Sequence, residues 1–200
     1  ACLKASLEAG EVTTVSKINT IADGTAVQTP GDKLFPYLQA NVDHVITVDD
    51  SELTLSFLDM AENHKMIVEN SGLLTVAALK HLDFKGKKVV SVLSGGNMDV
   101  LTMATVVQNG LMQRDRIFTV SVMLPDKPGQ LAAVSSLIAK EQGNVIKLEH
   151  NVFANVNRTA GVELTITLES FGTDHKDQII KALEAAGYCP VITKTNGIYM

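Results

Sequence analysis

The segment 162–169 reads Val-Glu-Leu-Thr-Ile-Thr-Leu-Glu, and its apolar and polar residues alternate without exception. Successive side chains of a strand point to opposite faces of a sheet. The alternation therefore predicts a strand with one dry face and one wet face. The segments around it decide which kind of sheet it joins.

The elements around this strand follow the order βαββαβ. Helical periodicity places Leu131, Val134, Leu137 and Ile138 on one face, and Gly143 and Gly187 are expected to end the two helices. The predicted elements are strand 117–124, helix 130–141, strand 145–149, strand 162–169, helix 174–186 and strand 189–193. This order predicts a ferredoxin-like unit, which needs only about 75 residues.

The first half of the chain alternates short apolar runs with helical patterns. The expected strands lie at 45–48, 66–68 and 89–93, with Asp49 and Asp50 offering capping oxygens to the first helix. The other helices are expected over 73–82 and from Asn97 to Val107. Strands that alternate with helices predict an α/β layered domain with a parallel sheet, here an incomplete one.

A polar interruption separates the two halves. Asn109-Gly110 and the segment 114–116 are expected to be flexible, and the periodicity changes after them. We therefore predict two domains, residues 1–114 and 115–200.

Composition excludes several classes of function. The net charge of −5, without a basic stripe interleaved with aromatic residues, argues against nucleic-acid binding. Apolar runs are too short to cross a bilayer, and the first eight residues lack a signal-peptide core, so a soluble protein without membrane partners is expected. Two distant cysteines suit a reducing cytoplasm, and the scattered histidines give no metal site.

A glycine loop follows the most apolar predicted strand. Ser94-Gly95-Gly96-Asn97 sits between that strand and a helix, where backbone N–H groups are free and a cofactor can approach closely. Short glycine loops are also common βα turns. Spacing alone leaves both readings open.

Three motifs, taken together, extend the interpretation. Ala22-Asp23-Gly24-Thr25, Glu69-Asn70-Ser71-Gly72 and Ser94-Gly95-Gly96-Asn97 resemble, in order and spacing, the C-terminal catalytic half of threonine ammonia-lyases. The resemblance covers about residues 1–108. These are fold-type-II enzymes, tryptophan synthase beta-like, that use pyridoxal 5'-phosphate. Asn70 departs from the small residue or proline expected there.

The resemblance implies roles for individual residues. Ser94 would hydrogen-bond the pyridine nitrogen of the cofactor, and a hydroxyl does not hold that nitrogen protonated. Glu69 would lie near the ring, and the backbone of Asp23 and Gly24 would pass beside it. The implied cofactor-binding set is Asp23, Gly24, Glu69, Ser94, Gly95 and Asn97. A capping carboxylate and a plain turn are the structural alternatives.

The lysine that forms the Schiff base in this family lies in an N-terminal Ser-Phe-Lys-x-Arg-like motif. That motif and the glycine-rich phosphate loop do not occur in these 200 residues. An imine cannot form without its amine. We therefore expect no catalytic residue in this chain and no activity from the chain alone.

The loop after strand 117–124 carries a second motif. Pro125-Asp126-Lys127-Pro128-Gly129-Gln130-Leu131 resembles the Asp-x-Pro-Gly-x-Leu loop of ACT domains. Asp126 can cap the helix, and Gly129 lets a ligand reach free N–H groups. ACT domains commonly pair and bind an amino acid between this loop and the second strand of the other copy. The implied effector site is Asp126, Gly129, Gln130, Leu131, Asn144, Val145 and Ile146.

The leading hypothesis is a cytoplasmic lyase that converts L-threonine to 2-oxobutanoate and ammonia, regulated by isoleucine with valine as a possible antagonist, and assembled as a homodimer or tetramer. A serine dehydratase or racemase of the same fold is the alternative within the enzyme class. A non-catalytic amino-acid-sensing dimer is the alternative outside it, because a fold does not imply a function.

Overall fold

A computed structural model describes residues 1–151 and 161–195 of the chain. Contacts between Cα atoms divide the chain into two compact units, Ala1–Val107 and Gln108–Met200. Helix α5 (Val100–Gln113) contributes residues to both. Each unit has its own cluster of buried apolar side chains.

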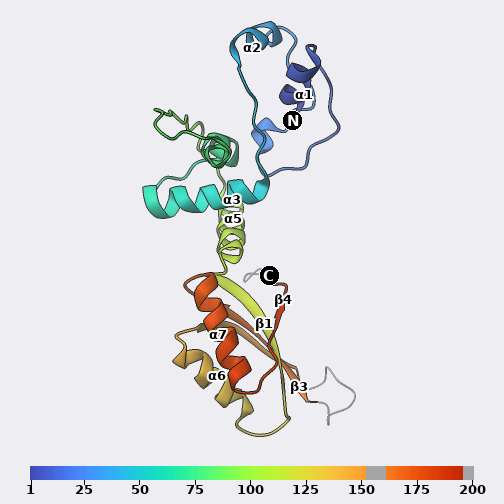
Figure 1. Ribbon diagram of the computed structural model, residues 1–200. Helices are drawn as coiled ribbons and strands as arrows, with labels where there is room; N and C mark the ends of the chain where they lie inside the picture. The colour runs from blue at the N-terminus through green and yellow to red at the C-terminus, as the bar shows by residue number, and fades with distance from the viewer. Residues whose placement is uncertain (152–160, 196–200) are drawn as a thin grey trace. The chain divides into compact units, whose positions relative to one another are not determined.

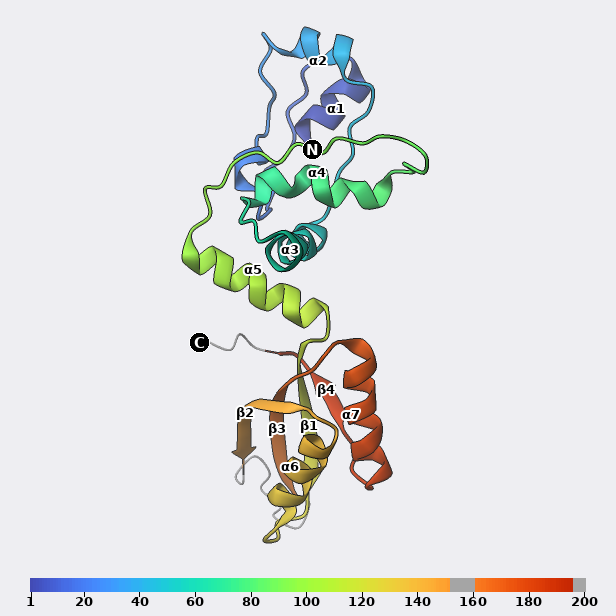
Figure 2. The same cartoon turned by 90° about the vertical axis from the view of Figure 1, so that its left-hand side faces the viewer.

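The second unit is a four-stranded antiparallel sheet in the order β2-β3-β1-β4, as Figure 2 shows. The strands are β1 (Ile117–Leu124), β2 (Asn144–Asn151), β3 (Val162–Glu169) and β4 (Val191–Thr193). Helices α6 (Gln130–Lys140) and α7 (Thr173–Ala185) lie side by side on the sheet (Figure 1). The predicted ferredoxin-like order is confirmed, and both β1 and β3 keep their predicted bounds.

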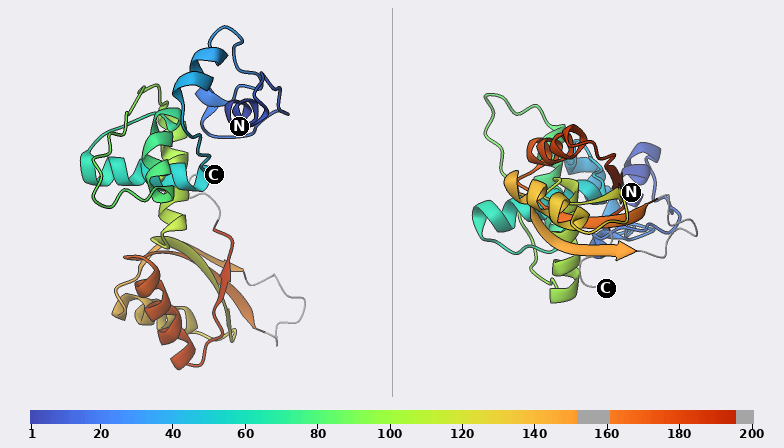
Figure 3. Two further views of the ribbon diagram at one scale, coloured as in Figure 1. Left: turned by 45° about the horizontal axis from the view of Figure 1, so that its top comes forward. Right: turned by 90° about the horizontal axis from the view of Figure 1, so that it is seen from below.

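The dry faces of the central strands meet the two helices. Val120 and Ile166, which are directly paired across β1 and β3, are both fully buried. Val134 and Ile138 of α6 and Ile179 of α7 pack into the same cluster. Both helices cover one face of the sheet, and no described helix of this unit lies on the other, which we call the open face (Figure 3).

The ends of the two helices use glycine in different ways. Gly187 has a φ of 86° and its N–H donates to Glu184 O, so it ends α7 as predicted. After α6 the left-handed position falls on Gln142, with a φ of 63°, and not on Gly143. Gly143 is needed for packing instead, because a Cβ there would lie 2.9 Å from Ile138 Cγ2.

The first unit is built from short helices and irregular chain. Its helices are α1 (Cys2–Ala9), α2 (Phe35–Asn41), α3 (Asp50–Asp59) and α4 (Leu74–Ala77), and its 3₁₀ or π turns are Asp23–Thr25, Met60–His64, Asn70–Leu73 and Ala78–His81. Helix α3 begins as predicted after Asp49, whose N–H donates to Glu52 Oε2 at 2.8 Å. Leu53 and Phe57 of α3 form the centre of the buried cluster.

The first half differs from the prediction in its strands. Residues 1–107, all of which are described, contain no strand, so the segments 45–48, 66–68 and 89–93 do not form the predicted parallel sheet. A strand exists only with a hydrogen-bonded neighbour, and these segments have none among the described residues. Val90 and Val92 of the last segment are consequently 88% and 65% exposed.

Helix α5 also runs through Asn109-Gly110, where a flexible interruption was predicted. The helix ends at Gln113, and the chain then turns at Asp115, which adopts a φ of 54°. Val106 is buried on the inner face of α5, and this packing outweighs the weak helix propensity of a single glycine. The domain boundary near residue 114 stays a prediction.

Candidate functional site

The three motifs of the first half meet in space. They come from a 3₁₀ turn at Asp23–Thr25, a 3₁₀ turn at Asn70–Leu73 and the irregular loop 94–97 that leads toward α5. We call residues 22–25, 69–72 and 94–97 the candidate cofactor cradle. Up to 75 positions separate its members along the chain, so only tertiary packing brings them together.

Glu69 joins the second motif to the glycine loop. Its Oε2 accepts a hydrogen bond from Asn97 N–H at 3.1 Å, and its own N–H donates to Gly95 O at 3.4 Å. Gly95 has a φ of 81°, and a Cβ there would lie 2.3 Å from Glu69 Cδ. The loop therefore needs glycine for both its conformation and its closeness to the carboxylate.

Gly72 makes the tightest approach in the cradle. A Cβ at Gly72 would lie 1.9 Å from Ser94 O, which is a backbone atom and cannot move aside as a side chain does. At Gly24 the corresponding distance is 2.8 Å, to Ser71 Oγ. Small residues at these two positions let the three motifs touch.

Asn70 ties the first motif to the second. Its side chain is 5% exposed, and Nδ2 donates to Ile21 O at 3.1 Å. Asp50 holds the same segment in place, because its carboxylate accepts hydrogen bonds from Thr20 Oγ1 at 2.5 Å and from Ile21 N–H at 3.1 Å. Sequence reasoning assigned Asp50 only to capping and missed this contact.

The polar groups of the cradle fit a polar cofactor. The Ser94 side chain is exposed and forms no hydrogen bond with the described residues. Asn70 Oδ1 is buried and has no partner among the described residues. A free hydroxyl and an unsatisfied carbonyl oxygen beside tightly packed glycines can serve a bound heterocycle. Asp23 is exposed, and its Oδ1 accepts from Gly24 N–H at 2.8 Å.

The predicted effector residues form two groups in the second unit. Asp126 does not cap α6, because Gly129 occupies the N-cap position with a φ of 90° and no side-chain cap bond forms. A Cβ at Gly129 would meet nothing within 4 Å, so the backbone is open to a ligand there. Leu131 is 36% exposed at the start of α6.

The second group lies at the other end of the sheet. Leu124, just before the loop, pairs with Val162, whereas Asn144 pairs with Glu169 at the opposite end of β3. At about 3.3 Å per residue, the partners of Leu124 and Asn144 on β3 lie roughly 23 Å apart. Val145 is 37% exposed, and Asn144 Nδ2 donates to Glu169 Oε2 at 3.1 Å. Within one chain, the loop therefore lies at the opposite end of β3 from Asn144 and Val145, at the start of β2.

No group of three or more metal-ligating side chains gathers among the described residues. Within the same part of the chain, no helix is long and apolar enough to pass through a membrane.

Comparison with known proteins gives a family for each half. Residues 1–95 match the family described as "Pyridoxal-phosphate dependent enzyme", and residues 118–187 match the ACT domain. The L-threonine ammonia-lyase of Geobacter sulfurreducens is 35% identical over 192 residues, which are 94% of this chain and 48% of the relative. That of Thermotoga maritima is 34% identical over 185 residues, which are 92% of this chain and 46% of the relative.

One similar solved structure is the processed form of threonine deaminase isoform 2 from Solanum lycopersicum, which is 25% identical in sequence. The match covers 55% of this chain and 33% of the solved chain, with a TM-score of 0.49. The chain spans about half the length of the curated relatives it matches. In this chain a segment that matches the pyridoxal-phosphate dependent enzyme family is followed by one that matches the ACT domain, a combination consistent with a threonine ammonia-lyase.

Proposed function

We propose that the protein containing this chain converts L-threonine to 2-oxobutanoate and ammonia with pyridoxal phosphate, and that the ACT domain senses an amino acid. The observation that carries the first part is the convergence of the three motifs, which places Ser94, Glu69 and Asn70 around one set of close-packed glycines. When bound, the cofactor supplies the electron-withdrawing ring on which elimination from threonine depends.

The residues of the chain would hold and orient that group. The Ser94 hydroxyl can donate to the ring nitrogen without placing a proton on it, which suits elimination over reactions that need a stronger electron sink. Gly72 and Gly95 let other segments pack closely around Ser94, since a Cβ at either position would overlap neighbouring atoms. Glu69 keeps the loop in place through Asn97 N–H.

The chain alone is proposed to be inactive. The Ser-Phe-Lys-x-Arg motif does not occur in the 200 residues, so we infer that the amine that would hold the cofactor is not supplied by them. The activity belongs to the longer protein.

The activity is tested with the full-length protein that contains this chain. L-threonine should yield 2-oxobutanoate, followed by reduction with a coupled dehydrogenase, and L-serine is assayed in parallel because a serine enzyme is the alternative. Ser94→Ala should lower kcat by roughly 100-fold or more, in the range of removing one well-placed polar group. Ser51→Ala, at an exposed position of α3, is the matched control.

Two outcomes would contradict these proposals separately. Product formed by the 200-residue chain alone would refute its inactivity. A full-length protein that is loaded with cofactor but turns over serine and not threonine would refute the proposed substrate.

The ACT domain is proposed to bind isoleucine, with valine as an antagonist, between two copies of the chain. The open backbone at Gly129 and the half-exposed Leu131 face solvent in one copy, and strand β2 of a second copy can supply Asn144, Val145 and Ile146. The wide separation of the two groups along β3 supports a shared site over a site within one chain. A homodimer or tetramer in the cytoplasm is the proposed state.

Isothermal titration of the 200-residue chain with L-isoleucine tests the sensor, with sedimentation velocity as the second measurement. Binding should strengthen self-association, because a ligand held by two copies stabilises the pair. Leu131→Asp should abolish both effects, because it places a charge at the half-exposed side chain of the proposed site. Ala132→Asp, at the next exposed position of α6, is the matched control. Tight isoleucine binding by a strictly monomeric chain would refute the shared site.

A further inference from the structure

The open face of the sheet carries a row of hydroxyl groups. Lys147 of β2 pairs with Thr167 of β3, Thr167 pairs with Thr119 of β1, and Thr119 pairs with Thr193 of β4. Residues directly opposite each other in neighbouring strands point to the same face. The four side chains therefore form one rung across all four strands, which we call the threonine rung.

The rung forms the floor of a hollow of about 370 Å³. Its lining residues are Thr119, Lys147, Glu149, Thr165, Thr167, Thr193 and Lys194. An irregularity between Val145 and Lys147 interrupts the regular register of β2 at one side of this hollow. The hollow lies on the face away from α6 and α7 and includes none of the predicted effector residues.

The described residues do not satisfy all the hydroxyl groups of the rung. Thr119 Oγ1 and Thr167 Oγ1 lie 3.0 Å apart and share one hydrogen bond, although these residues are only 5% and 7% exposed. One hydroxyl hydrogen of this pair therefore has no acceptor among the described residues. Thr193 Oγ1 is buried and has no partner there either. Buried hydroxyl groups are normally hydrogen-bonded, so two adjacent hydrogens without acceptors call for a ligand or ordered water.

The charges at the rim are unequal. Lys147 Nζ and Glu149 Oε1 form an ion pair at 2.8 Å. Lys194, immediately after β4, forms no ion pair with the residues that the structure describes. The hollow therefore presents hydroxyl hydrogens on its floor and one uncompensated positive charge at its edge. An acceptor-rich group with a single negative charge complements this arrangement.

We propose that the threonine rung binds a small monocarboxylate, with the carboxylate oxygens accepting hydrogen bonds from the rung hydroxyls and from Lys194. A carboxylate offers about four acceptor sites and one negative charge, which matches the free hydrogens and the single unpaired lysine. This site is separate from the loop at Gly129 and does not depend on the proposed enzymatic function.

The test is a titration of the intact 200-residue chain, with threonine methyl groups labelled for NMR. Sodium L-lactate is the probe, and propane-1,2-diol, which has the same carbon skeleton without the carboxylate, is the matched ligand control. Sodium chloride at equal ionic strength controls for screening. Lactate should shift the methyl signals of Thr119, Thr165, Thr167 and Thr193 in a saturable manner, and the diol and salt should not.

Two variants assign the effect to the proposed groups. Lys194→Gln, at an exposed position, should weaken lactate binding by roughly tenfold, as expected for one charge-assisted hydrogen bond. Lys181→Gln, an equal change of charge on the exposed side of α7, should leave binding unchanged. Thr119→Val removes one hydroxyl at nearly constant shape and should also weaken binding, with thermal unfolding confirming that the variant is folded.

Several outcomes would overturn the proposal. These are shifts that do not saturate, shifts of equal size with the diol, and binding that survives both Lys194→Gln and Thr119→Val. The proposal would also fail if lactate does not bind and Thr119→Val changes the sedimentation coefficient. That result would assign this face to a contact between copies of the chain.

Discussion

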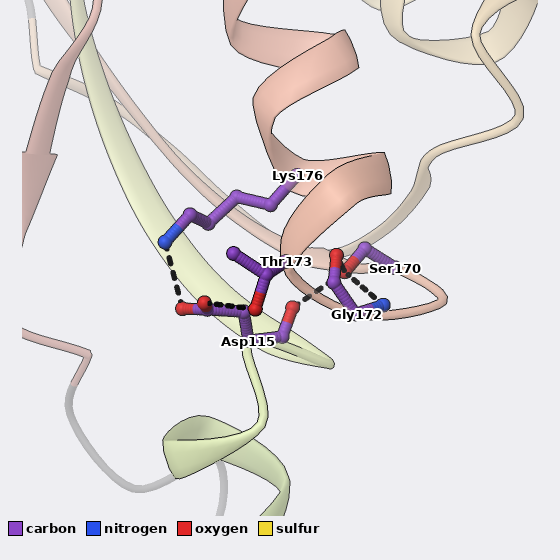
Figure 4. A network of polar contacts seen from close by, with 5 residues as sticks. All are labelled: Asp115, Ser170, Gly172, Thr173 and Lys176. Carbon is purple, nitrogen blue, oxygen red and sulfur yellow. Dashed lines mark hydrogen bonds and ion pairs between the residues drawn. The ribbon is translucent and has the colours of Figure 1, made fainter.

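Lys176 Nζ lies 2.7 Å from Asp115 Oδ1, which joins the first turn of α7 to the segment that follows α5. Thr173 Oγ1 donates to the second oxygen of the same carboxylate at 2.8 Å (Figure 4). Asp115 is held in the left-handed region with a φ of 54°. The network thus fixes a backbone conformation that is unusual for a residue other than glycine.

The acid stability of the chain should depend on Asp115. Burial raises the pKa of this carboxyl, but the hydrogen bonds from Lys176 and Thr173, and the charge of Lys176, lower it below its ordinary value. A lowered pKa means that the carboxylate stabilises the folded state above its unfolded pKa of about 3.9. This contribution is lost as the pH falls through the lower folded pKa.

Asp115→Asn isolates the charge, because asparagine tolerates the left-handed conformation as well as aspartate does. The free energy of unfolding should fall by about 1–2 kcal/mol at neutral pH, since the pair is only partly exposed. Urea unfolding from neutral pH to about pH 3 should show the difference from the native chain shrinking toward the acid end. Asp177→Asn on the same helix is the control, and a difference independent of pH would contradict the assignment.

Ser170 supports the same turn from the other side. It is 4% exposed, its hydroxyl donates to Asp115 O at 2.5 Å, and its N–H donates to Arg116 O at 2.8 Å. Ser170→Ala should cost about 1–2 kcal/mol of unfolding free energy, because it leaves a carbonyl oxygen without its donor. Denaturant unfolding measures this, with Ser136→Ala at an exposed position of α6 as the control. Equal stabilities of the two variants would show that the hydroxyl contributes nothing.

Gly72→Ala should disrupt the candidate cofactor cradle. The new methyl group would overlap Ser94 O, so either the loop 94–97 or the turn at Asn70–Leu73 must move, at a cost of about 3 kcal/mol. Hydrogen exchange of the α3 amides, which share the buried cluster with Leu73, should accelerate. Gly31→Ala is the matched control because a Cβ there meets nothing within 4 Å. Unchanged exchange in the Gly72 variant would mean that the cradle is looser than the packing indicates.

The effect of Val90→Asp on stability should differ between this chain and the proposed longer protein. The Val90 side chain is 88% exposed here, so Val90→Asp should change the stability of the 200-residue chain by no more than about 0.5 kcal/mol. In the full-length protein the same change should be strongly destabilising, provided that segment 89–93 forms the buried strand that its sequence predicts. Thermal unfolding of both proteins measures this, and equal effects in the two would refute the predicted strand.

The second unit could be predicted from the sequence because each of its patterns is completed within the chain. Segment 162–169 alternates strictly, and its partner 117–124 is present to form the ladder. The segments 45–48 and 89–93 are also apolar, but they pair with no strand among the described residues, and no local pattern reveals that. Sequence periodicity describes what a segment can do, whereas a strand also needs a partner.

The cradle shows the same division between local and tertiary information. Its motifs were recognised from their order, yet the reason for each glycine became clear only from contacts between distant segments, such as Gly72 with Ser94 and Gly95 with Glu69. From the sequence alone, Asn70 is only a departure from the pattern of the family that the motifs resemble. Its hydrogen bond to Ile21, 49 positions away, gives the residue a structural task that no local signal predicts.

The placement of the Gly129 loop and Asn144 at opposite ends of β3 sets how a shared sensor must respond. In the proposed arrangement, two copies related by a two-fold axis would form two identical sites, and a single chain would form none. Sensitivity to the amino acid would then rise with the abundance of the protein itself, and dilution alone would silence it.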